Sequence, residues 1–480
     1  MNYIIRDRKP EAVFRYFEEI SAIPRGSFNE KGIADYLVDF ARARGLECHR
    51  DSMHNVLIKA PATAGWEQAA PLMLQGHTDM VCEKNGDVEH DFLKDPLELW
   101  LDGKYLRAKG TTLGADNGIA VAMMMAMLDG CMKEHPALEC LFTTAEEVGL
   151  NGAHAFDYSL ISARRMINLD SEEQGIVTVG CAGGLRSDLT LEFRAVPVQS
   201  GCVRIAVKGL MGGHSGVNIN SGRANANKLM GRILAALVEA QECGLVRLEG
   251  GSKDNAIPRE CEAVLAVSDV DAAIDLLTDA AEALAKEMGE DDRSFTVVCE
   301  SCEPESVMMD VETTRRAITL LACVTNGVMT MSPQVKGLVE FSRNLGVIRF
   351  EDQKLTFVFS TRSSLEAQLD ASIRELELWA RLTGCTTKHH SRYPGWAYAP
   401  QSPLRDAYLQ AYRALSGRDA KVDIIHAGLE CGVISSHLPD MDMISIGPDM
   451  KDIHSPDEAL DLDSVEEFWK LVEDLIRRLK

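Results

Sequence analysis

The chain has 480 residues, of which 46% are hydrophobic and 26% are charged, and its formal net charge is −23. This length predicts about two or three domains, and the composition is that of an ordinary globular protein with a sizeable core. The acidic excess repels nucleic-acid phosphates and anionic membrane surfaces, so we expect neither nucleic acid nor membrane as a partner.

The cysteines and the N-terminus indicate a cytoplasmic protein. The 13 cysteines follow no regular framework, and an odd number in a long chain is typical of reduced thiols. One CxxC, Cys299 and Cys302, has no second pair at the spacing of a zinc ribbon. The N-terminal segment lacks the apolar region of a signal peptide, and the apolar stretch at 119–128 is too short to span a membrane.

The first part of the chain alternates helical and strand-like segments. Apolar residues recur at helical spacing in some segments, and short apolar runs bounded by turn residues indicate strands between them. We predict helices over 11–23, 30–45 and 119–128, and strands over 55–61, 71–77, 138–147 and 164–170. Gly45 is expected to end the second helix. This alternation predicts an α/β domain with a mostly parallel sheet.

From about residue 187 the pattern changes to strands with period two and strongly amphipathic helices. Strands are expected over 189–195, 202–210, 263–269, 295–300, 346–350 and 354–364, and helices over 224–242, 272–289 and 368–384. A passage rich in Pro and Gly at 388–403 marks the return to an α/β pattern. We therefore predict an α/β catalytic domain, 1–186 and 394–480, interrupted by an inserted α+β domain, 187–393.

Polar side chains that can bind metal follow several of the predicted strands. His77 and Asp79 are two residues apart, so on an extended chain they share a face and suit a metal ligand and the carboxylate that orients it. Glu146 and Glu147 are adjacent acids that repel each other unless a cation or a shared proton separates their roles. Asp170 ends a further strand. Each feature alone is more often a solvated turn than a metal site.

Two loops each add one candidate ligand. Asp116 lies in a Gly-flanked loop before an apolar helix, where a carboxylate commonly caps the helix. His454 follows an apolar strand, and a lone loop histidine is commonly a surface residue. Taken together, two histidines with three carboxylates suit two zinc ions that share one bridging carboxylate. Such a pair activates water, and a free carboxylate beside it serves as general base.

The motifs GHTDM, LGADNGIA, TTAEEVG, INLDSEE and IHSPDE together resemble those of aminoacyl-histidine dipeptidases, also called Xaa-His dipeptidases or peptidase D, within the carnosinase-like two-zinc metallopeptidases. The resemblance covers essentially the whole chain. It implies that His77 and Asp170 bind one zinc ion, that Glu147 and His454 bind the other, and that Asp116 bridges them.

The same resemblance implies roles around the metals. Asp79 is expected to orient His77, and Glu146 is expected to act as the catalytic general base. The bridging aspartate of the family is followed by a cis peptide, which corresponds to Asp116–Asn117 here. His214, in the Gly-rich turn GLMGGHSGVNI, matches a histidine that stabilises the tetrahedral oxyanion, often from the partner subunit.

Candidate substrate contacts come mainly from the insert, which the resemblance assigns to a lid that also carries dimer contacts. Arg362 matches an arginine that binds the substrate carboxylate, for which a bidentate guanidinium is suited. Asn255 could bind substrate through its amide or simply cap a turn, and Glu430 could meet the substrate amino end. Arg343 is a weaker candidate of the same kind as Arg362, and His426 stays undecided.

The sequence therefore predicts a cytoplasmic zinc dipeptidase that hydrolyses unblocked dipeptides through a zinc-bridging water activated by Glu146. The resemblance alone implies a homodimer and a preference for Xaa-His dipeptides, including β-alanyl-histidine. The cofactor is expected to be Zn²⁺, two per subunit, although Mn²⁺ or Co²⁺ also suit carboxylate-rich sites. One alternative is an N-acyl amino acid deacylase with the same metals. Another is a zinc-binding regulatory protein without turnover, against which Glu146 beside Glu147 speaks.

Overall fold

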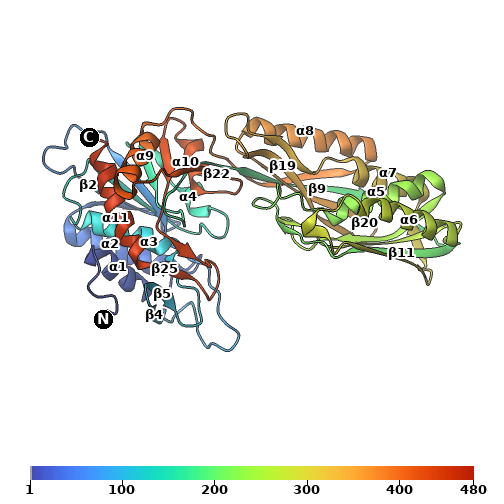
Figure 1. The fold of residues 1–480 in the computed structure, drawn as a ribbon, viewed down its shortest axis with the longest axis horizontal. Helices are drawn as coiled ribbons and strands as arrows, with labels where there is room; N and C mark the ends of the chain where they lie inside the picture. The colour runs from blue at the N-terminus through green and yellow to red at the C-terminus, as the bar shows by residue number, and fades with distance from the viewer. Residues whose placement is uncertain (1–2) are drawn as a thin grey trace. The chain divides into compact units, whose positions relative to one another are not determined.

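The computed structural model describes residues 3–480 and separates the chain into two compact units (Figure 1). The first unit contains the chain up to Cys181 together with Trp396–Ile424 and Leu429–Lys480. The inserted unit contains Ala182–Gly395 and Ile425–Gly428. The expected insert, 187–393, ends within a few residues of Ala182–Gly395, but the sequence did not indicate that Ile425–Gly428 also belongs to this unit.

An eight-stranded sheet forms the centre of the first unit, in the order β1-β2-β6-β3-β7-β23-β8-β22. The strands are β1 (Glu47–Arg50), β2 (Val56–Ala60), β3 (Leu72–His77), β6 (Leu138–Thr143), β7 (Arg165–Asn168), β8 (Ile176–Cys181), β22 (Lys421–Ile425) and β23 (Asp442–Ser445). The middle strands β6, β3, β7 and β23 run parallel. By contrast, β1 pairs antiparallel with β2, β2 with β6, and β8 with β23. The predicted mostly parallel sheet therefore holds for the centre and is wrong at the flanks.

Helices surround this sheet. They are α1 (Glu11–Ser21), α2 (Lys31–Arg44), α3 (Ala115–Leu128), α4 (Asn151–Ala155), α9 (Pro403–Ser416), α10 (Glu430–His437) and α11 (Leu462–Arg477), with a short 3-10 turn at Tyr158–Leu160. As predicted, Gly45 ends α2 in the left-handed region, at φ 65°. Nearly all of α3 is buried, which explains why its sequence has no polar face.

A small second sheet of the first unit was not predicted from the sequence. It has the order β24-β25-β5-β4, with β4 (Leu99–Asp102), β5 (Tyr105–Ala108), β24 (Met450–Lys451) and β25 (Ala459–Asp461). Because β24 and β25 flank the loop that carries His454, this sheet holds that loop against a hairpin from the first part of the chain.

The inserted unit is built on one nine-stranded sheet, in the order β16-β11-β15-β13-β19-β20-β9-β21 with β18 paired to β19. Its strands are β9 (Gly183–Glu192), β11 (Gly201–Lys208), β13 (Cys243–Gly250), β15 (Cys261–Val267), β16 (Thr296–Cys302), β18 (Gly327–Met331), β19 (Val339–Glu351), β20 (Lys354–Ser363) and β21 (Thr386–Tyr393). Short strands β10 (Ala195–Pro197) and β12 (Gly213–His214) pair with β17 (Val307–Met309) and β14 (Ala256–Ile257).

The sheet of the inserted unit consists of two modules, one nested in the other. The inner module runs β11-α5-β13-β15-α6-β16, and the outer module runs β9, then α7-β19-β20-α8-β21. In each module the strands lie in the order fourth, first, third, second, which is the order of a ferredoxin-like βαββαβ unit. The two modules meet where β13 pairs with β19 in the middle of the sheet. The inner module is inserted between the first strand and the first helix of the outer one.

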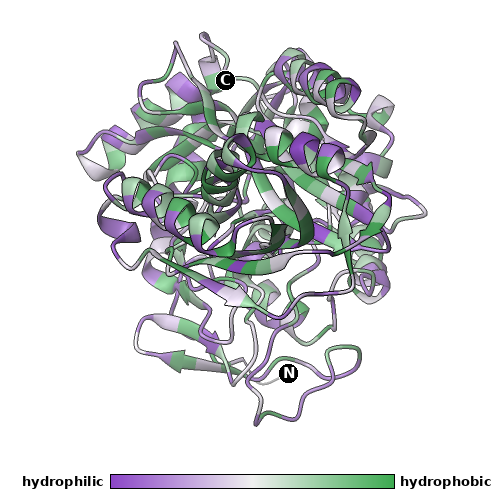
Figure 2. Cartoon of the chain, turned by 90° about the vertical axis from the view of Figure 1, so that its right-hand side faces the viewer, coloured by the Kyte–Doolittle hydropathy of each residue, from purple (hydrophilic) through white to green (hydrophobic). Residues whose placement is uncertain are grey.

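All the long helices of the inserted unit pack into a single core with the strands. These helices are α5 (Ala226–Ala240), α6 (Val270–Ala285), α7 (Val311–Cys323) and α8 (Glu366–Thr383), and a 3-10 turn spans Glu290–Asp292. Figure 2 shows hydrophobic and hydrophilic residues mixed along the helices, as expected where one face is buried. Within residues 3–480, no helix combines the length and the apolar composition needed to cross a bilayer.

Candidate active site

The structure brings together the five residues predicted to bind metal. Their potential ligand atoms form groups within 4.8 Å of one another: His77, Asp116 and Asp170, and also Asp116, Glu147 and His454. The reason lies in the topology, since β3, β6 and β7 are parallel neighbours and their carboxyl ends meet at one edge of the sheet.

Asp116 belongs to both groups, with one carboxylate oxygen for each. Its Oδ1 lies 3.1 Å from Nε2 of His77, and its Oδ2 lies 3.1 Å from Nε2 of His454. Asp170 Oδ1 lies 3.3 Å from Nε2 of His77 on the first side. Glu147 Oε1 lies 3.0 Å from Nε2 of His454 on the second side. Two sets of ligand atoms that share one carboxylate are the arrangement that holds a pair of divalent ions.

The charges of this cluster also favour cations. Hydrogen bonds to Asp116 and Glu147 raise the pKa of His454 to about 10. Burial raises the pKa of Asp170 to about 6, and the charge of Asp116 adds to that rise. Buried carboxylates that crowd each other in this way are stabilised by a positive ion, because desolvation of unpaired negative charge is costly.

Asp79 connects His77 with the adjacent acids. Its carboxylate lies 3.4 Å from Nδ1 of His77 and accepts hydrogen bonds from the backbone N–H groups of Glu146 (3.1 Å) and Glu147 (3.3 Å). The hydroxyl of Ser27 donates a further bond of 2.8 Å. Asp79 is therefore placed both to orient the imidazole of His77 and to fix the turn that carries both glutamates.

Glu146 lies beside His77 and Glu147, with potential ligand atoms of the three within 4.8 Å of one another. Burial raises the pKa of Glu146 well above its ordinary value, Asp170 adds to the rise, and His77 opposes it. Glu146 belongs to neither of the two groups that share Asp116. A carboxylate with a raised pKa next to a metal cluster is suited to accept and return a proton.

The loop after Asp116 has the predicted backbone. The Asp116–Asn117 peptide is cis. The side-chain amide of Asn117 donates a hydrogen bond of 2.8 Å to the carbonyl oxygen of Leu169, next to Asp170. A Cβ at Gly76 would meet Asn117 Oδ1 at 2.3 Å, so the glycine before His77 leaves the room that Asn117 occupies.

His214 and Asn255 lie next to each other in the inserted unit. His214 is the strand partner of Ala256, and the N–H of Ser215 donates to the carbonyl oxygen of Asn255 at 2.8 Å. The backbone N–H groups of Gly216 and Val217 both donate to Nδ1 of His214, at 3.2 Å. Because Nδ1 accepts, the proton of the neutral ring is on Nε2, which is then available as a donor.

Arg362, on β20, lies close to polar groups from β19, β21 and the segment that contains His426. It is 5% exposed, and its Nη1 donates to the hydroxyl of Tyr393 at 3.1 Å. Ser342, its partner across β19 and β20, lies 2.7 Å from Nε2 of His426. Burial lowers the pKa of His426 to about 3, and the charge of Arg362 contributes. His426 thus belongs to this group, which the sequence left open.

The remaining candidates differ in their surroundings. Glu430 is fully buried in the first unit at the start of α10, and its carboxylate accepts bonds from Gln75 (2.5 Å) and Thr143 (2.7 Å). Burial raises its pKa to about 7. Arg343 is also fully buried and pairs with Glu375 at 2.9 Å within the inserted unit.

Comparison with known proteins assigns the chain to a family. Residues 55–199 match the model of peptidase family M28, and residues 205–292 match the peptidase dimerisation domain. The chain is 38% identical over 474 residues to the cytosol non-specific dipeptidase of Escherichia coli (strain K12), with 98% of each covered. The chain belongs to the aminoacyl-histidine dipeptidase family of metallopeptidases.

Solved structures of relatives agree with this membership. The aminoacylhistidine dipeptidase of Vibrio alginolyticus has a TM-score of 0.93 and 37% identity, covering 98% of this chain and 97% of the other. The aminopeptidase PepT of Bacillus cereus covers 98% of this chain and 99% of its own at 15% identity and a TM-score of 0.56, which shows a shared fold. As a family member the chain is a hydrolase that acts on peptide bonds.

Some polar neighbours of the candidate site residues carry little signal in the sequence. Tyr393 meets Arg362 through the pairing of β9 with β20 and β21. His426, in the loop after β22, meets Ser342 on β19. No local motif indicates either contact. Glu458 is part of the motif IHSPDE, so the motif could have singled out this glutamate as well as His454.

Proposed function

We propose that this chain is a metallodipeptidase that hydrolyses unblocked dipeptides, preferentially those with a C-terminal histidine, including β-alanyl-histidine. The observation that carries the proposal is the pair of ligand groups that share Asp116. The names of the relatives support dipeptides as substrates: one is a non-specific dipeptidase and the other an aminoacylhistidine dipeptidase. We take the second name as support for the histidine preference.

The donor set fits two zinc ions. We propose that His77 and Asp170 hold one ion, that Glu147 and His454 hold the other, and that Asp116 bridges them. Imidazole nitrogen and carboxylate oxygen are ordinary zinc ligands, while Mn²⁺ and Co²⁺ accept the same donors. When bound, the metal pair polarises the scissile carbonyl and lowers the pKa of water.

Glu146 then serves as the proton carrier. Its carboxylate accepts a proton from the attacking water, and burial, which raises the pKa of Glu146, favours the protonated carboxyl. It returns the proton to the nitrogen of the leaving amine. Asp79 acts through His77, whose ring it orients, and so is a positioning residue.

Residues of the inserted unit bind the substrate and stabilise the transition state. The Nε2–H of His214 is proposed to donate to the developing oxyanion. The guanidinium of Arg362 is proposed to pair with the C-terminal carboxylate of the dipeptide, and Asn255 to add an amide contact. Glu430 is proposed to attract the substrate amino group from the first unit.

The inserted unit is also proposed to serve as a lid and to carry the contacts of a homodimer. Its match to a peptidase dimerisation domain supports this role. A cytoplasmic location is proposed because the protein's relative is a cytosol enzyme and its own cysteines follow no disulfide framework.

The function is tested with a panel of dipeptides, assayed before and after chelation and again after zinc is added back. We expect the highest kcat/KM for Xaa-His dipeptides, loss of hydrolysis with chelator, and recovery with zinc. Faster hydrolysis of N-acetyl amino acids would instead identify a deacylase. Stoichiometric zinc without hydrolysis of any peptide would identify a binding protein.

A further inference from the structure

Two charged side chains are buried close to the proposed metal centre. Arg25 is 1% exposed and Glu458 is 2% exposed. Neither contributes an atom to the groups that could hold a metal. Burial lowers the pKa of the Arg25 guanidinium, and the charge of Glu458 opposes that shift.

Glu458 joins the loop of His454 to the turn that contains Asp116. Its carboxylate accepts hydrogen bonds from four consecutive backbone N–H groups, those of Leu113 (2.7 Å), Gly114 (2.9 Å), Ala115 (2.8 Å) and Asp116 (3.3 Å). These groups lie at and just before the start of α3, where the backbone of Asp116 is not helical, so they have no partner within the helix and bond to the carboxylate instead. Because Glu458 is four residues after His454, one carboxylate holds both segments.

Arg25 joins the same turn to the end of β3. Its Nη1 donates to the carbonyl oxygens of Thr78 (3.0 Å) and Asp79 (3.3 Å), and its Nη2 donates to that of Gly114 (2.5 Å). A Cβ at Gly114 would meet Nη2 at 2.5 Å, and one at Gly118 would meet it at 2.6 Å. The glycines of LGADNG therefore leave space for this guanidinium.

We propose that Arg25 and Glu458 are positioning residues of the metal centre. They hold the three segments that carry His77, Asp116 and His454 at the spacing that a pair of metal ions requires. The carboxylates of an empty centre repel one another, so the segments need a rigid support. Charge-assisted hydrogen bonds from buried groups supply it, because opening them would leave unpaired charge without water. This inference rests on the proposed function.

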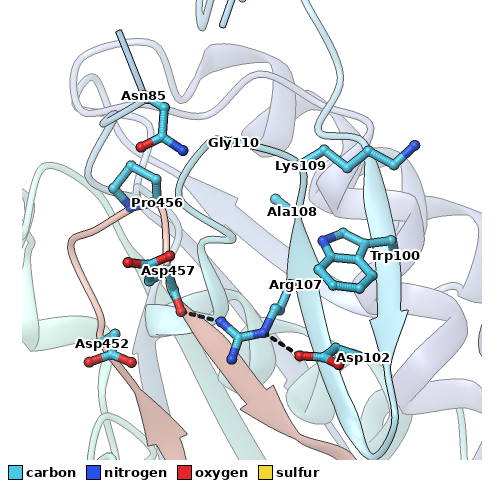
Figure 3. Close-up of a pocket in the computed structure, with 10 residues that line it drawn as sticks. All are labelled: Asn85, Trp100, Asp102, Arg107, Ala108, Lys109, Gly110, Asp452, Pro456 and Asp457. Carbon is cyan, nitrogen blue, oxygen red and sulfur yellow. Dashed lines mark hydrogen bonds and ion pairs between the residues drawn. The ribbon is translucent and has the colours of Figure 1, made fainter. Parts of the chain in front are cut away.

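A second contact of the His454 loop, made by Arg107, is exposed. There Nη1 of Arg107 donates to the carbonyl oxygen of Asp457 at 2.5 Å, and its Nε donates to Asp102 at 3.1 Å (Figure 3). These residues line an open cavity of about 690 Å³ that also includes Asp452 and Pro456. Water competes for such exposed bonds, so we assign the positioning role to the buried pair.

The test is Glu458→Gln, which keeps the shape of the side chain but turns an NH₂ group toward the backbone N–H donors. We expect zinc affinity, measured by competition with a chromophoric chelator, to fall about 10–100-fold, as for other residues that support metal ligands. At saturating zinc we expect kcat to fall while KM changes little. The thermal stabilisation that zinc gives should shrink correspondingly.

Glu139 provides a matched control. It is also buried, and it accepts backbone hydrogen bonds from Ser162 (3.0 Å) and Ala163 (3.0 Å), but it lies near the start of β6, at the opposite end from Glu146. Glu139→Gln should lower the unfolding temperature of the metal-free protein and leave zinc affinity unchanged. Equal zinc affinity in Glu458→Gln and the wild type, or an equal loss in both variants, would overturn the proposal.

Arg25→Lys gives a second variant in case Glu458→Gln does not fold. A lysine keeps the charge but lacks the planar fork that reaches three carbonyl oxygens, so zinc affinity should again fall. Unchanged affinity in this variant would also overturn the proposal. If the wild-type chain itself bound no zinc and cleaved no dipeptide, the proposed function would fail instead, and the two failures are thus distinguishable.

Discussion

The histidines of the two units lie near side chains of opposite charge. In the first unit, the pKa of His454 is raised to about 10 by Asp116 and Glu147, and that of His77 is also raised, since nearby carboxylates outweigh its burial. In the inserted unit, burial and the charge of Arg362 lower the pKa of His214 and bring that of His426 to about 3.

The opposite charges around the histidines indicate which ligands each unit is suited to bind. A cluster with excess negative charge stabilises cations, so the first unit is suited to hold a metal pair. A cluster with excess positive charge and neutral histidines stabilises anions, which suits a substrate carboxylate and a developing oxyanion. The same kind of side chain is therefore suited to bind a metal ion in one unit and to act as a neutral hydrogen-bond donor in the other.

Glu146→Gln is expected to have the largest effect on turnover, and it tests the first unit. The first unit should keep its metal but lose its proton carrier, so kcat should fall about 10²–10⁴-fold while zinc content stays at the wild-type level. Steady-state kinetics and metal analysis of the same sample measure both. The neighbouring variant Glu147→Gln is the control and should lose zinc. Near-normal turnover of Glu146→Gln would remove it from the mechanism.

In the inserted unit, His214→Ala removes the proposed donor to the oxyanion. We expect kcat to fall about 10²–10³-fold with zinc content unchanged, because a lost donor weakens the transition state and not the metal centre. His390→Ala, at a half-exposed site on β21, should leave kcat unchanged. A drop in zinc content with His214→Ala would instead assign this histidine to the metal centre.

Arg362→Lys tests whether the inserted unit binds the carboxylate of the substrate. The charge stays but the bidentate fork is lost, so KM for a dipeptide should rise about tenfold, which corresponds to about 1.4 kcal/mol. A dipeptide amide, which lacks the carboxylate, should be cleaved with the same KM by variant and wild type. A tenfold rise in the KM for the amide as well would show that Arg362 does not bind the carboxylate.

The smallest effect is the pH response of His426. Its folded pKa of about 3 is below the ordinary value, so the folded state binds fewer protons than the unfolded state between these values. Its contribution to stability is therefore complete above about pH 6.5 and declines as the pH falls toward 3. An NMR titration should show the ring neutral from pH 8 to 5, and a midpoint near 6.5 would contradict this.

Much of the fold was readable from local sequence patterns. The spacing of apolar residues predicted α1, α2, α5, α8 and the central strands of the first unit, and Gly45 marked a helix end. Other elements were missed, among them β13, α7 and the hairpin of β4 and β5. The nesting of the two modules was also missed, because β9 pairs with β20, which lies far along the chain, and such pairing leaves no local period.

The sequence by itself determined which side chains end the central strands, since short apolar runs followed by His, Asp or Glu are local features. Only the tertiary structure decided which of these side chains meet and what supports them. Asp116 reaches both histidines, and Glu458 reaches Leu113 across 345 positions of the chain. The physical reason is that a buried charge is stabilised by whichever groups the fold brings to it, and those groups need not be near it in sequence.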